Sequence, residues 1–241
     1  MLPIQKKDPP AELVELKNEA ARRGLKPKEA YEQLRNPLKK QVMTQLMEEQ
    51  GHLCAYCMRR IPDERVPSKD IADVSIEHWF ARDPKSGEDR GQGLDYNNFL
   101  AVCSGNCGLK GQRKKGELTC DAKRGNRDLT INPLDPDTLK SIFYRANGEI
   151  ATSDPLYEDD LLVKLNLNCM STSVMLPLAR KKVLDSVQTD VLQNSTEENR
   201  VRYCQHILNC FENESDPKTP YIGIAIWWLR TYIKDMNGNV L

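Results

Sequence analysis

The clustering of cysteines is the feature that most constrains this chain. Five of its eight cysteines lie between positions 54 and 120, and the first two form the tight pair Cys54-Ala-Tyr-Cys57. Such clustering in a reducing compartment is typical of metal binding rather than of disulfides. A thioredoxin-like redox pair would need a surrounding βαβ pattern, which is missing. The sequence therefore predicts a structural zinc ion held by four thiolates.

The second half of this zinc site has three candidates, of which a tetrahedral sulfur shell needs only two. Cys103 follows an apolar, strand-like run, and Cys120 opens a segment that can start a helix. We expect these two to complete the site that Cys54 and Cys57 begin. The more compact pair of Cys103 with Cys107 is the alternative. A site of this kind contributes on the order of 10 kcal/mol to folding.

The other three cysteines lie in apolar surroundings and are expected to be small buried side chains: Cys169, Cys204 and Cys210. Apolar residues recur at helical spacing on both sides of the cysteine-rich middle. An Asn147-Gly148 pair between apolar runs predicts a β-hairpin. We therefore expect an α+β, predominantly helical fold in three parts. These are an N-terminal helical segment (1–51), a zinc-stapled core (52–152) and a C-terminal helical region (153–241).

Composition and hydropathy limit the functions available. The 35 basic residues are balanced by 35 acidic residues. Binding to nucleic acid by bulk charge is therefore not indicated, and any contact would need a local basic patch. The N-terminal residues lack the apolar run of a signal peptide. No stretch approaches the roughly 20 apolar residues that span a bilayer. We expect a cytoplasmic protein with no membrane partner.

A carboxylate and an imidazole, Glu77-His78, lie between the two halves of the cysteine set. The other histidines, His52 and His206, have simpler interpretations as surface or structural residues. Twenty residues after His78, Asn98 lies in a segment that leads directly into the third cysteine of the proposed site. This spacing favours a chemical role for Glu77 and His78.

The order CxxC, Glu-His, Asn-Phe-Leu, Cys and Cys-Asp-x-x-Arg-Gly resembles the zinc-containing HNH endonucleases. In that family two short strands carry the histidine and the asparagine, and a helix opening at the last cysteine carries a third active residue. The resemblance implies a ββα-metal core. Asn98 fits its asparagine, because it stands five residues before Cys103. Asp121 takes a slot that is usually His or Asn, and Arg124-Gly125 replaces a Lys-Gly pair.

Further motifs across residues 40–235 resemble the PtuB group of HNH proteins from Septu and retron-associated antiphage systems. They are Cys-Ala-Tyr-Cys, Glu-His-Trp, Tyr-Asn-Asn-Phe-Leu-Ala-Val-Cys, Asn-Pro-Leu-Asp-Pro and Leu-Asn-Leu-Asn. This resemblance implies a partner ATPase of the PtuA type. In some systems it also implies a retron reverse transcriptase with its RNA–DNA hybrid. Trp227 and Trp228 are either a docking surface for such a partner or part of the core.

Hydrolysis of a phosphodiester requires an activated water and stabilisation of charge on the phosphate. We assign the role of general base to His78, because a neutral imidazole accepts a proton near pH 7. Oxygen ligands suit Mg²⁺ or Mn²⁺, for which Glu77 and Asp121 are the candidates. Asn98 would hold the loop between the strands and so orient His78. The basic residues expected to contact nucleic-acid phosphates are Lys114, Lys115, Lys123 and Arg124.

Two functions from different classes remain open. The first is an HNH nuclease that acts on DNA or RNA. The second is a non-catalytic zinc-knuckle module that binds nucleic acid or serves as an adaptor. It explains the cysteines and lysines but not the spacing of Glu77-His78 and Asn98. Simpler roles for single residues are a salt bridge for Glu77, a helix N-terminal acid for Asp121 and a turn residue for Asn98.

Overall fold

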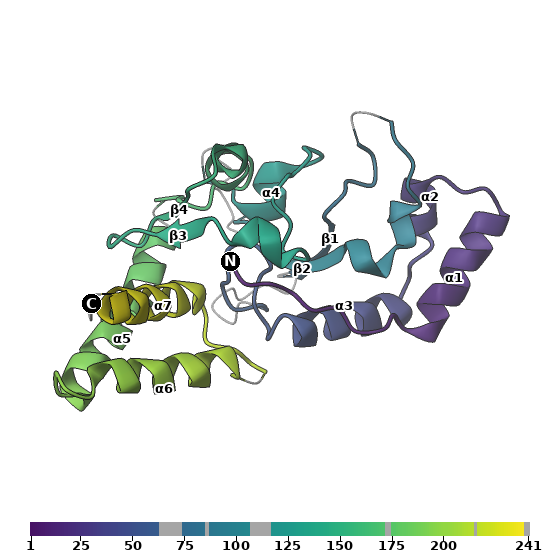
Figure 1. Cartoon of the computed structure of the whole chain (residues 1–241). Helices are drawn as coiled ribbons and strands as arrows, with labels where there is room; N and C mark the ends of the chain where they lie inside the picture. Colours follow the sequence, from purple (N-terminus) through teal and green to yellow (C-terminus); the bar gives the residue numbers. More distant parts are fainter. Residues whose placement is uncertain (63–73, 85–86, 107–116, 172–174, 215, 239–241) are drawn as a thin grey trace.

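Helices predominate in this protein, and both of its sheets are small, two-stranded and antiparallel (Figure 1). The structure is a computed structural model of the chain. It describes residues 1–62, 74–84, 87–106, 117–171, 175–214 and 216–238. The expected mixture of helices and short strands is confirmed.

Three helices precede the cysteine-rich segment: α1 (Ala11–Arg22), α2 (Pro27–Glu32) and α3 (Leu38–Glu49). Gly24 has a φ of +64°, a left-handed conformation that glycine adopts without strain, just beyond the end of α1. Pro37 separates α2 from α3, because proline lacks the N–H that would continue the helical hydrogen bonds.

The first sheet pairs β1 (Val74–His78) with β2 (Phe99–Cys103), and His78 lies opposite Phe99. Every residue of β2 is buried. The short helix α4 (Cys120–Arg124) packs against β2. Gln50, just after α3, caps the open edge of β2: its side-chain amide exchanges hydrogen bonds of 2.7 and 2.8 Å with the main chain of Ala101. These contacts fix the strands that carry the candidate site.

The second sheet is the expected hairpin of β3 (Ile142–Tyr144) and β4 (Ile150–Thr152). Gly148 in its turn has a φ of +86°, and a Cβ there would lie 2.0 Å from the carbonyl oxygen of Pro177. Both the backbone conformation and the close approach therefore require glycine.

The C-terminal region contains α5 (Leu176–Asn194), α6 (Arg200–Glu212) and α7 (Gly223–Gly238), and α7 packs on α5, α6 and β3. Residues 158–171 contain one short helical stretch at their start, mostly the π-helical turn Asp160–Lys164, so they are less helical than expected. The side chain of Asn168 there exchanges hydrogen bonds with the main chain of Ile150, which ties this segment to the hairpin instead. None of the described helices combines the length and apolarity needed to cross a bilayer.

Short turns of helix connect these elements. The 3₁₀ turns span Gln92–Leu94, Tyr96–Asn98, Pro136–Leu139 and Pro155–Tyr157, and the π turn spans Asp160–Lys164.

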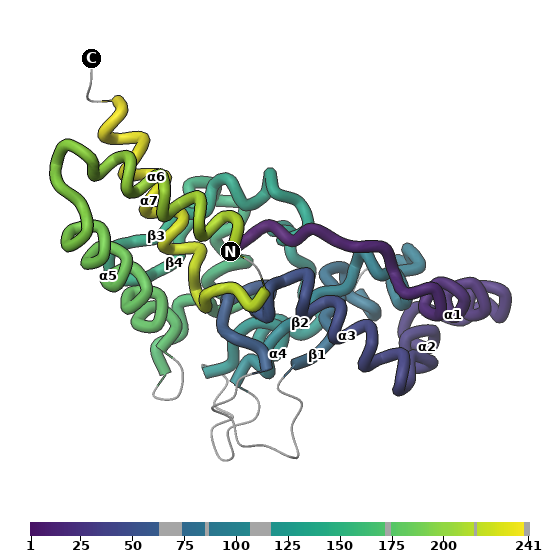
Figure 2. Tube along the Cα trace, turned by 90° about the horizontal axis from the view of Figure 1, so that it is seen from below, coloured from purple at the N-terminus to yellow at the C-terminus, as the bar shows by residue number. Residues whose placement is uncertain are grey.

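One hydrophobic core includes buried residues from all three parts of the chain. The N-terminal segment runs along α3 towards α1, as Figure 2 shows. Its Ile4 N–H donates to the carbonyl oxygen of Pro133 at 2.8 Å, and the amino group of Met1 donates to the Tyr144 hydroxyl. The N-terminal and C-terminal parts therefore pack directly against the cysteine-rich core.

Candidate functional site

Four buried cysteines converge at the base of the first sheet. Cys54 and Cys57 come from the turn after α3, Cys103 ends β2 and Cys120 begins α4. The Sγ atoms of Cys54 and Cys120 are 3.8 Å apart, those of Cys57 and Cys103 are 3.8 Å apart, and those of Cys103 and Cys120 are 3.7 Å apart. A tetrahedron of sulfurs with Zn–S bonds near 2.3 Å has edges of about 3.8 Å. The four side chains therefore fit a zinc ion.

These four cysteines are the set preferred from the sequence, and Cys107 lies outside the described residues. Cys169 and Cys204 are buried, as expected, but Cys210 is exposed. The expectation of a buried Cys210 was wrong, because it lies six positions after Cys204 on α6. Six helical positions rotate a side chain by about 240°, away from the core-facing side.

Two buried guanidinium groups lie near the thiolates, those of Arg59 and Arg180. A zinc ion with four thiolates carries an excess negative charge, which is costly to bury without a counter-charge. Burial alone would lower the pKa of Arg59, but the thiolates of Cys103 and Cys57 raise it well above its ordinary value. Arg59 donates to the Asn106 Oδ1 atom at 3.2 Å. The fold thus supplies positive charge where the proposed ion leaves negative charge.

His78 ends β1 with only 3% of its surface exposed. Its ring lies between the edges of two aromatic rings, those of Tyr31 and Phe99, at centroid distances of 4.7 and 4.8 Å. Its Nε2 atom is 3.1 Å from the carbonyl oxygen of Gly93. Because a carbonyl only accepts hydrogen bonds, we assign the proton to Nε2 and a lone pair to Nδ1. Burial lowers the pKa of His78 to about 3, so the imidazole is neutral near pH 7.

Asn98 joins the two ends of the loop between β1 and β2. Its side-chain Nδ2 donates to the carbonyl oxygen of Phe80 at 2.9 Å, and its Oδ1 accepts from the Phe80 N–H at 2.7 Å. Its own carbonyl accepts from the Trp79 N–H at 3.0 Å. Gly93, the partner of His78, lies within the loop that Asn98 closes. The amide therefore supports the backbone on which the imidazole depends.

Two residues that hold His78 carried no signal in the sequence. Tyr31, on α2, contacts the imidazole ring edge-on. Gly93 presses so closely on the start of α2 that a Cβ there would lie 1.9 Å from the carbonyl oxygen of Pro27. A single tyrosine in a helix and a single glycine in a loop are too common to be recognised before the fold is known.

The carboxylate of Glu77 is buried on the side of β1 that faces α4. Its Oε1 atom forms an ion pair with the Nη1 atom of Arg124 and accepts a hydrogen bond from the Tyr56 hydroxyl at 3.2 Å. Burial and the neighbouring carboxylate of Asp121 raise the pKa of Glu77 to about 8, although Arg124 acts in the opposite direction. Two carboxylates this close, of which one is deeply buried, are the arrangement expected of a divalent-cation site.

Arg124 was expected to contact nucleic-acid phosphates, and the structure contradicts this. Only 2% of its surface is exposed. Besides Glu77, its guanidinium donates to the carbonyl oxygens of His78 at 2.8 Å, Trp79 at 2.5 Å and Arg127 at 2.7 Å. Its donors are therefore used inside the protein. Of the other lysines expected to bind phosphate, Lys123 is half-buried on α4, and Lys114 and Lys115 lie outside the described residues.

Among the described histidine, cysteine, aspartate and glutamate side chains, only the four cysteines form a cluster of three or more ligands around one point. Glu77 and Asp121 are neighbours, and His78 is the next residue along β1, but its imidazole does not join them in one ligand set. The expected site residues that the structure describes therefore lie around β1 and α4. The imidazole of His78 and the carboxylates of Glu77 and Asp121 do not form one ligand cluster.

In comparisons with known proteins, no family model and no curated protein matches this chain. The assignment of a function therefore depends on the residues and contacts described above.

Proposed function

We propose that this protein is a metal-dependent nuclease of the HNH type, in which β1, β2 and α4 form the ββα-metal core and zinc holds the core together. The observation that carries the proposal is the state of His78. The Nε2 atom of its buried ring lies 3.1 Å from the carbonyl oxygen of Gly93, and His78 directly follows Glu77, whose carboxylate adjoins Asp121. A general base and a pair of oxygen ligands are the groups that phosphodiester hydrolysis requires.

In this proposal Nδ1 of His78 takes a proton from the attacking water. No described residue donates a hydrogen bond to Nδ1, so its lone pair is available. The positive charge that develops on the ring is stabilised through Nε2, which donates to the Gly93 carbonyl. A pKa of about 3 would make a weak base, but the negative charge of a bound phosphate raises the pKa of a nearby imidazole towards the useful range.

Glu77 and Asp121 would hold Mg²⁺ or Mn²⁺, with water and substrate oxygens as further ligands. Such a cation polarises the phosphate and stabilises the leaving oxygen. The raised pKa of Glu77 supports this assignment, since adjacent carboxylates gain from a shared cation. The zinc site has four thiolates and no open position, so its role is structural.

The motif order supports a more specific role, effector of a cytoplasmic antiphage defence system similar to those of the PtuB group. A partner ATPase of the PtuA type would restrain the nuclease, and a retron reverse transcriptase with its RNA–DNA hybrid is a further partner in that role. The aromatic residues of α7 are only partly committed to the core. Trp227 packs edge-on against Tyr144 at 6.0 Å, and Trp228 stacks on Tyr232 at 5.4 Å.

One contact favours the second candidate function, a non-catalytic zinc-knuckle module. The ion pair with Arg124 already occupies the carboxylate of Glu77, which a structural role alone would explain. The two functions are separated by the behaviour of His78, because a binding module has no use for a general base.

The deciding experiment incubates the chain, alone and with its partner ATPase, with panels of DNA and RNA in Mg²⁺ or Mn²⁺. The His78→Ala variant is the control. We expect cleavage by the wild type and none by the variant, while zinc content and nucleic-acid binding are retained. Equal cleavage by both proteins, or no cleavage by the wild type with its partner and either cation, would refute the nuclease proposal.

A further inference from the structure

We propose that Arg82 and Lys39 form a binding site for backbone phosphates of the nucleic-acid substrate, beside His78 and separate from the carboxylates of Glu77 and Asp121. The inference rests on the proposed nuclease function and adds to it the residues that recognise the substrate. No basic run in the sequence points to these two residues, which are 43 positions apart in the printed sequence. The tertiary structure brings both of them to the ring of Tyr31.

Arg82 lies in the loop that leaves β1, four residues after His78. Its Cζ atom is 4.4 Å from the centroid of the Tyr31 ring, and the same ring contacts His78 edge-on. A guanidinium that rests on an aromatic face keeps the N–H donors in its own plane available. Among the described residues Arg82 forms no hydrogen bond or ion pair. Its donors are therefore free, one side chain away from the proposed base.

Lys39 reaches the same ring from α3. Its Nζ atom is 5.6 Å from the Tyr31 centroid, and its side chain is exposed. No described carboxylate pairs with it. Two cations around one ring are mutually repulsive, so the fold keeps them together at a cost that an anion would remove.

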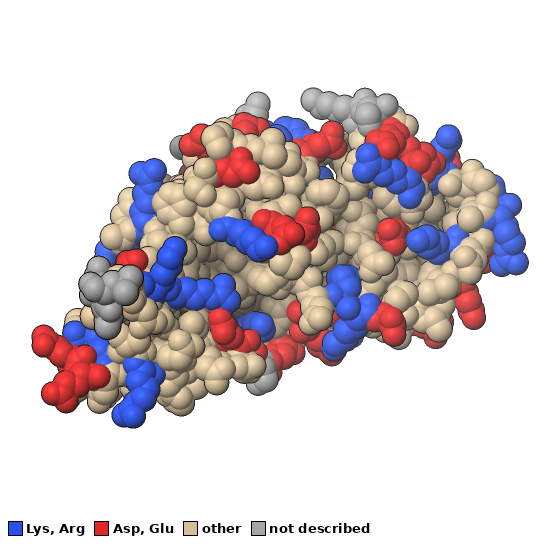
Figure 3. All heavy atoms as spheres, viewed as in Figure 1, with Lys and Arg blue, Asp and Glu red and all other residues tan. Residues whose placement is uncertain are grey.

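The other cations near the site have partners. Arg124 is buried against Glu77, and Arg90, which lies over the Phe80 ring, is held by Glu88 at 2.6 Å. On the face shown in Figure 3, Lys and Arg are interspersed with Asp and Glu rather than gathered into one basic surface. Unpaired positive charge beside His78 is thus a local feature rather than a consequence of overall charge.

The positive charges of Arg82 and Lys39 beside the Tyr31 ring suit a phosphodiester. A guanidinium matches two phosphate oxygens at once, and an ammonium adds a point charge, so together they suit a strand's successive phosphates.

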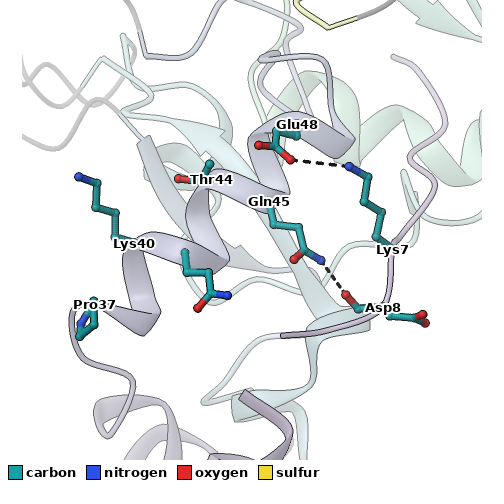
Figure 4. A pocket seen from close by; sticks show the side chains of 8 residues that line it. Lys7, Asp8, Pro37, Lys40, Thr44, Gln45 and Glu48 are labelled. Atoms are coloured by element: carbon teal, nitrogen blue, oxygen red, sulfur yellow. Dashed lines mark hydrogen bonds and ion pairs between the residues drawn. The ribbon is translucent and has the colours of Figure 1, made fainter. Parts of the chain in front are cut away.

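The test measures binding of short fluorescein-labelled DNA and RNA strands by anisotropy over a range of salt concentrations. No divalent cation or chelator is added, so cleavage is prevented and zinc is retained. The variants are Arg82→Ala, Arg82→Lys and Lys39→Ala. Lys40→Ala is the matched control, because Lys40 is the next residue on α3 but lines a different hollow with Thr44 and Glu48, as Figure 4 shows.

We expect each of the two alanine variants to bind roughly three- to tenfold more weakly at low salt, and the slope of log affinity against log salt to fall by about 1. Arg82→Lys should retain most of the affinity, and Lys40→Ala should bind as the wild type does. Equal losses on DNA and RNA support a phosphate contact. Zinc content and thermal unfolding confirm that each variant is folded.

The inference is overturned if Arg82→Ala and Lys39→Ala bind like the wild type, if Lys40→Ala loses as much affinity as they do, or if the losses are confined to one type of sugar. It is also overturned if the wild type binds neither strand. Cleavage is measured separately with Mg²⁺. If the wild type cleaves nucleic acid, and Arg82→Ala and Lys39→Ala bind and cleave it as well as the wild type does, the proposed phosphate site is refuted. The nuclease proposal is not.

Discussion

The guanidinium of Arg124, at the end of α4, forms a buried ion pair with the carboxylate of Glu77 on β1 and also donates to the carbonyl oxygen of His78. The helix that carries Arg124 begins at Cys120, one of the four clustered cysteines. Arg124 therefore links this helix to the strand that carries the proposed base. Its role is to position β1, which explains why a residue expected at the surface is among the most buried in the protein.

Removing this link should destabilise the fold. We expect Arg124→Ala to cost about 3–5 kcal/mol of unfolding free energy, because it leaves Glu77 buried without its ion-pair partner and removes the donor to three carbonyl oxygens. Arg124→Lys should cost less, since it keeps the charge but loses the fork of donors. Urea unfolding measures both. Arg230→Ala removes an exposed ion pair with Glu212 and should cost less than about 1 kcal/mol. A loss for Arg124→Ala no larger than that of this control would contradict the positioning role.

Zinc should be stoichiometric and essential to the core. We expect one zinc per chain by elemental analysis, and Cys120→Ser should lose the metal and unfold the first sheet, because metal binding contributes on the order of 10 kcal/mol. Cys210→Ser changes a cysteine that is exposed on α6, and it should retain both zinc and stability. A Cys120→Ser protein with full zinc content and native unfolding would show that the ion is held elsewhere.

The burial of His78 predicts a specific dependence of stability on pH. Its pKa is about 3 in the folded protein against 6.5 when unfolded. The unfolded state therefore binds more protons below pH 6.5, and stability falls as pH falls. From about pH 7 to about pH 5 the loss due to this residue is about 2 kcal/mol. The difference between wild type and His78→Gln across this range isolates it, since thiolate protonation affects both proteins. Parallel stability curves for the two would show that the imidazole titrates normally.

Binding of the proposed Mg²⁺ or Mn²⁺ ion should strengthen as pH rises. Because the pKa of Glu77 is raised to about 8, a proton competes with Mg²⁺ at neutral pH. The Mg²⁺ concentration that half-activates cleavage should therefore fall as pH rises, by up to about tenfold per unit, and level off above about pH 8. Asp121→Asn removes one carboxylate and should weaken this dependence while zinc content is unchanged. A half-activating concentration that does not vary with pH would exclude Glu77 as a ligand.

Asn98 and its neighbour Asn97 offer a matched pair. Asn98 is buried and closes the loop through Phe80, whereas Asn97 is exposed. Asn98→Ala should lower kcat by about tenfold or more with little change in KM, because it loosens the loop that orients His78. Asn97→Ala should leave kcat near that of the wild type. The measurement is kcat of each variant at saturating substrate. A loss of kcat in Asn97→Ala but not in Asn98→Ala would contradict the role of Asn98 in orienting His78.

Local patterns in the sequence were sufficient for the elements that frame the site. The run before Cys103 predicted β2, Asn147-Gly148 predicted the hairpin, and the cysteine spacing predicted the ligand set that the structure assembles. The two strand predictions depend only on residues that are neighbours in the sequence. The prediction of the ligand set depends on the number and kind of ligands that zinc requires, and the cysteines that meet this requirement can be read from the sequence. The same reasoning failed for residues 158–171, where side-chain hydrogen bonds to the hairpin replace helical ones.

What the sequence determined is the set of chemical groups: four thiolates, an imidazole after a carboxylate, and strands and helices to carry them. Only the tertiary structure decided which charged side chains are paired inside the protein and which are unpaired. Arg124 forms an ion pair with Glu77, which is 47 residues away in the sequence. Arg82 lies over the ring of Tyr31, 51 residues away, and has no described ion-pair partner. Burial and pairing arise from contacts between distant segments, and the free energy of a charge depends on those contacts rather than on its neighbours in the chain.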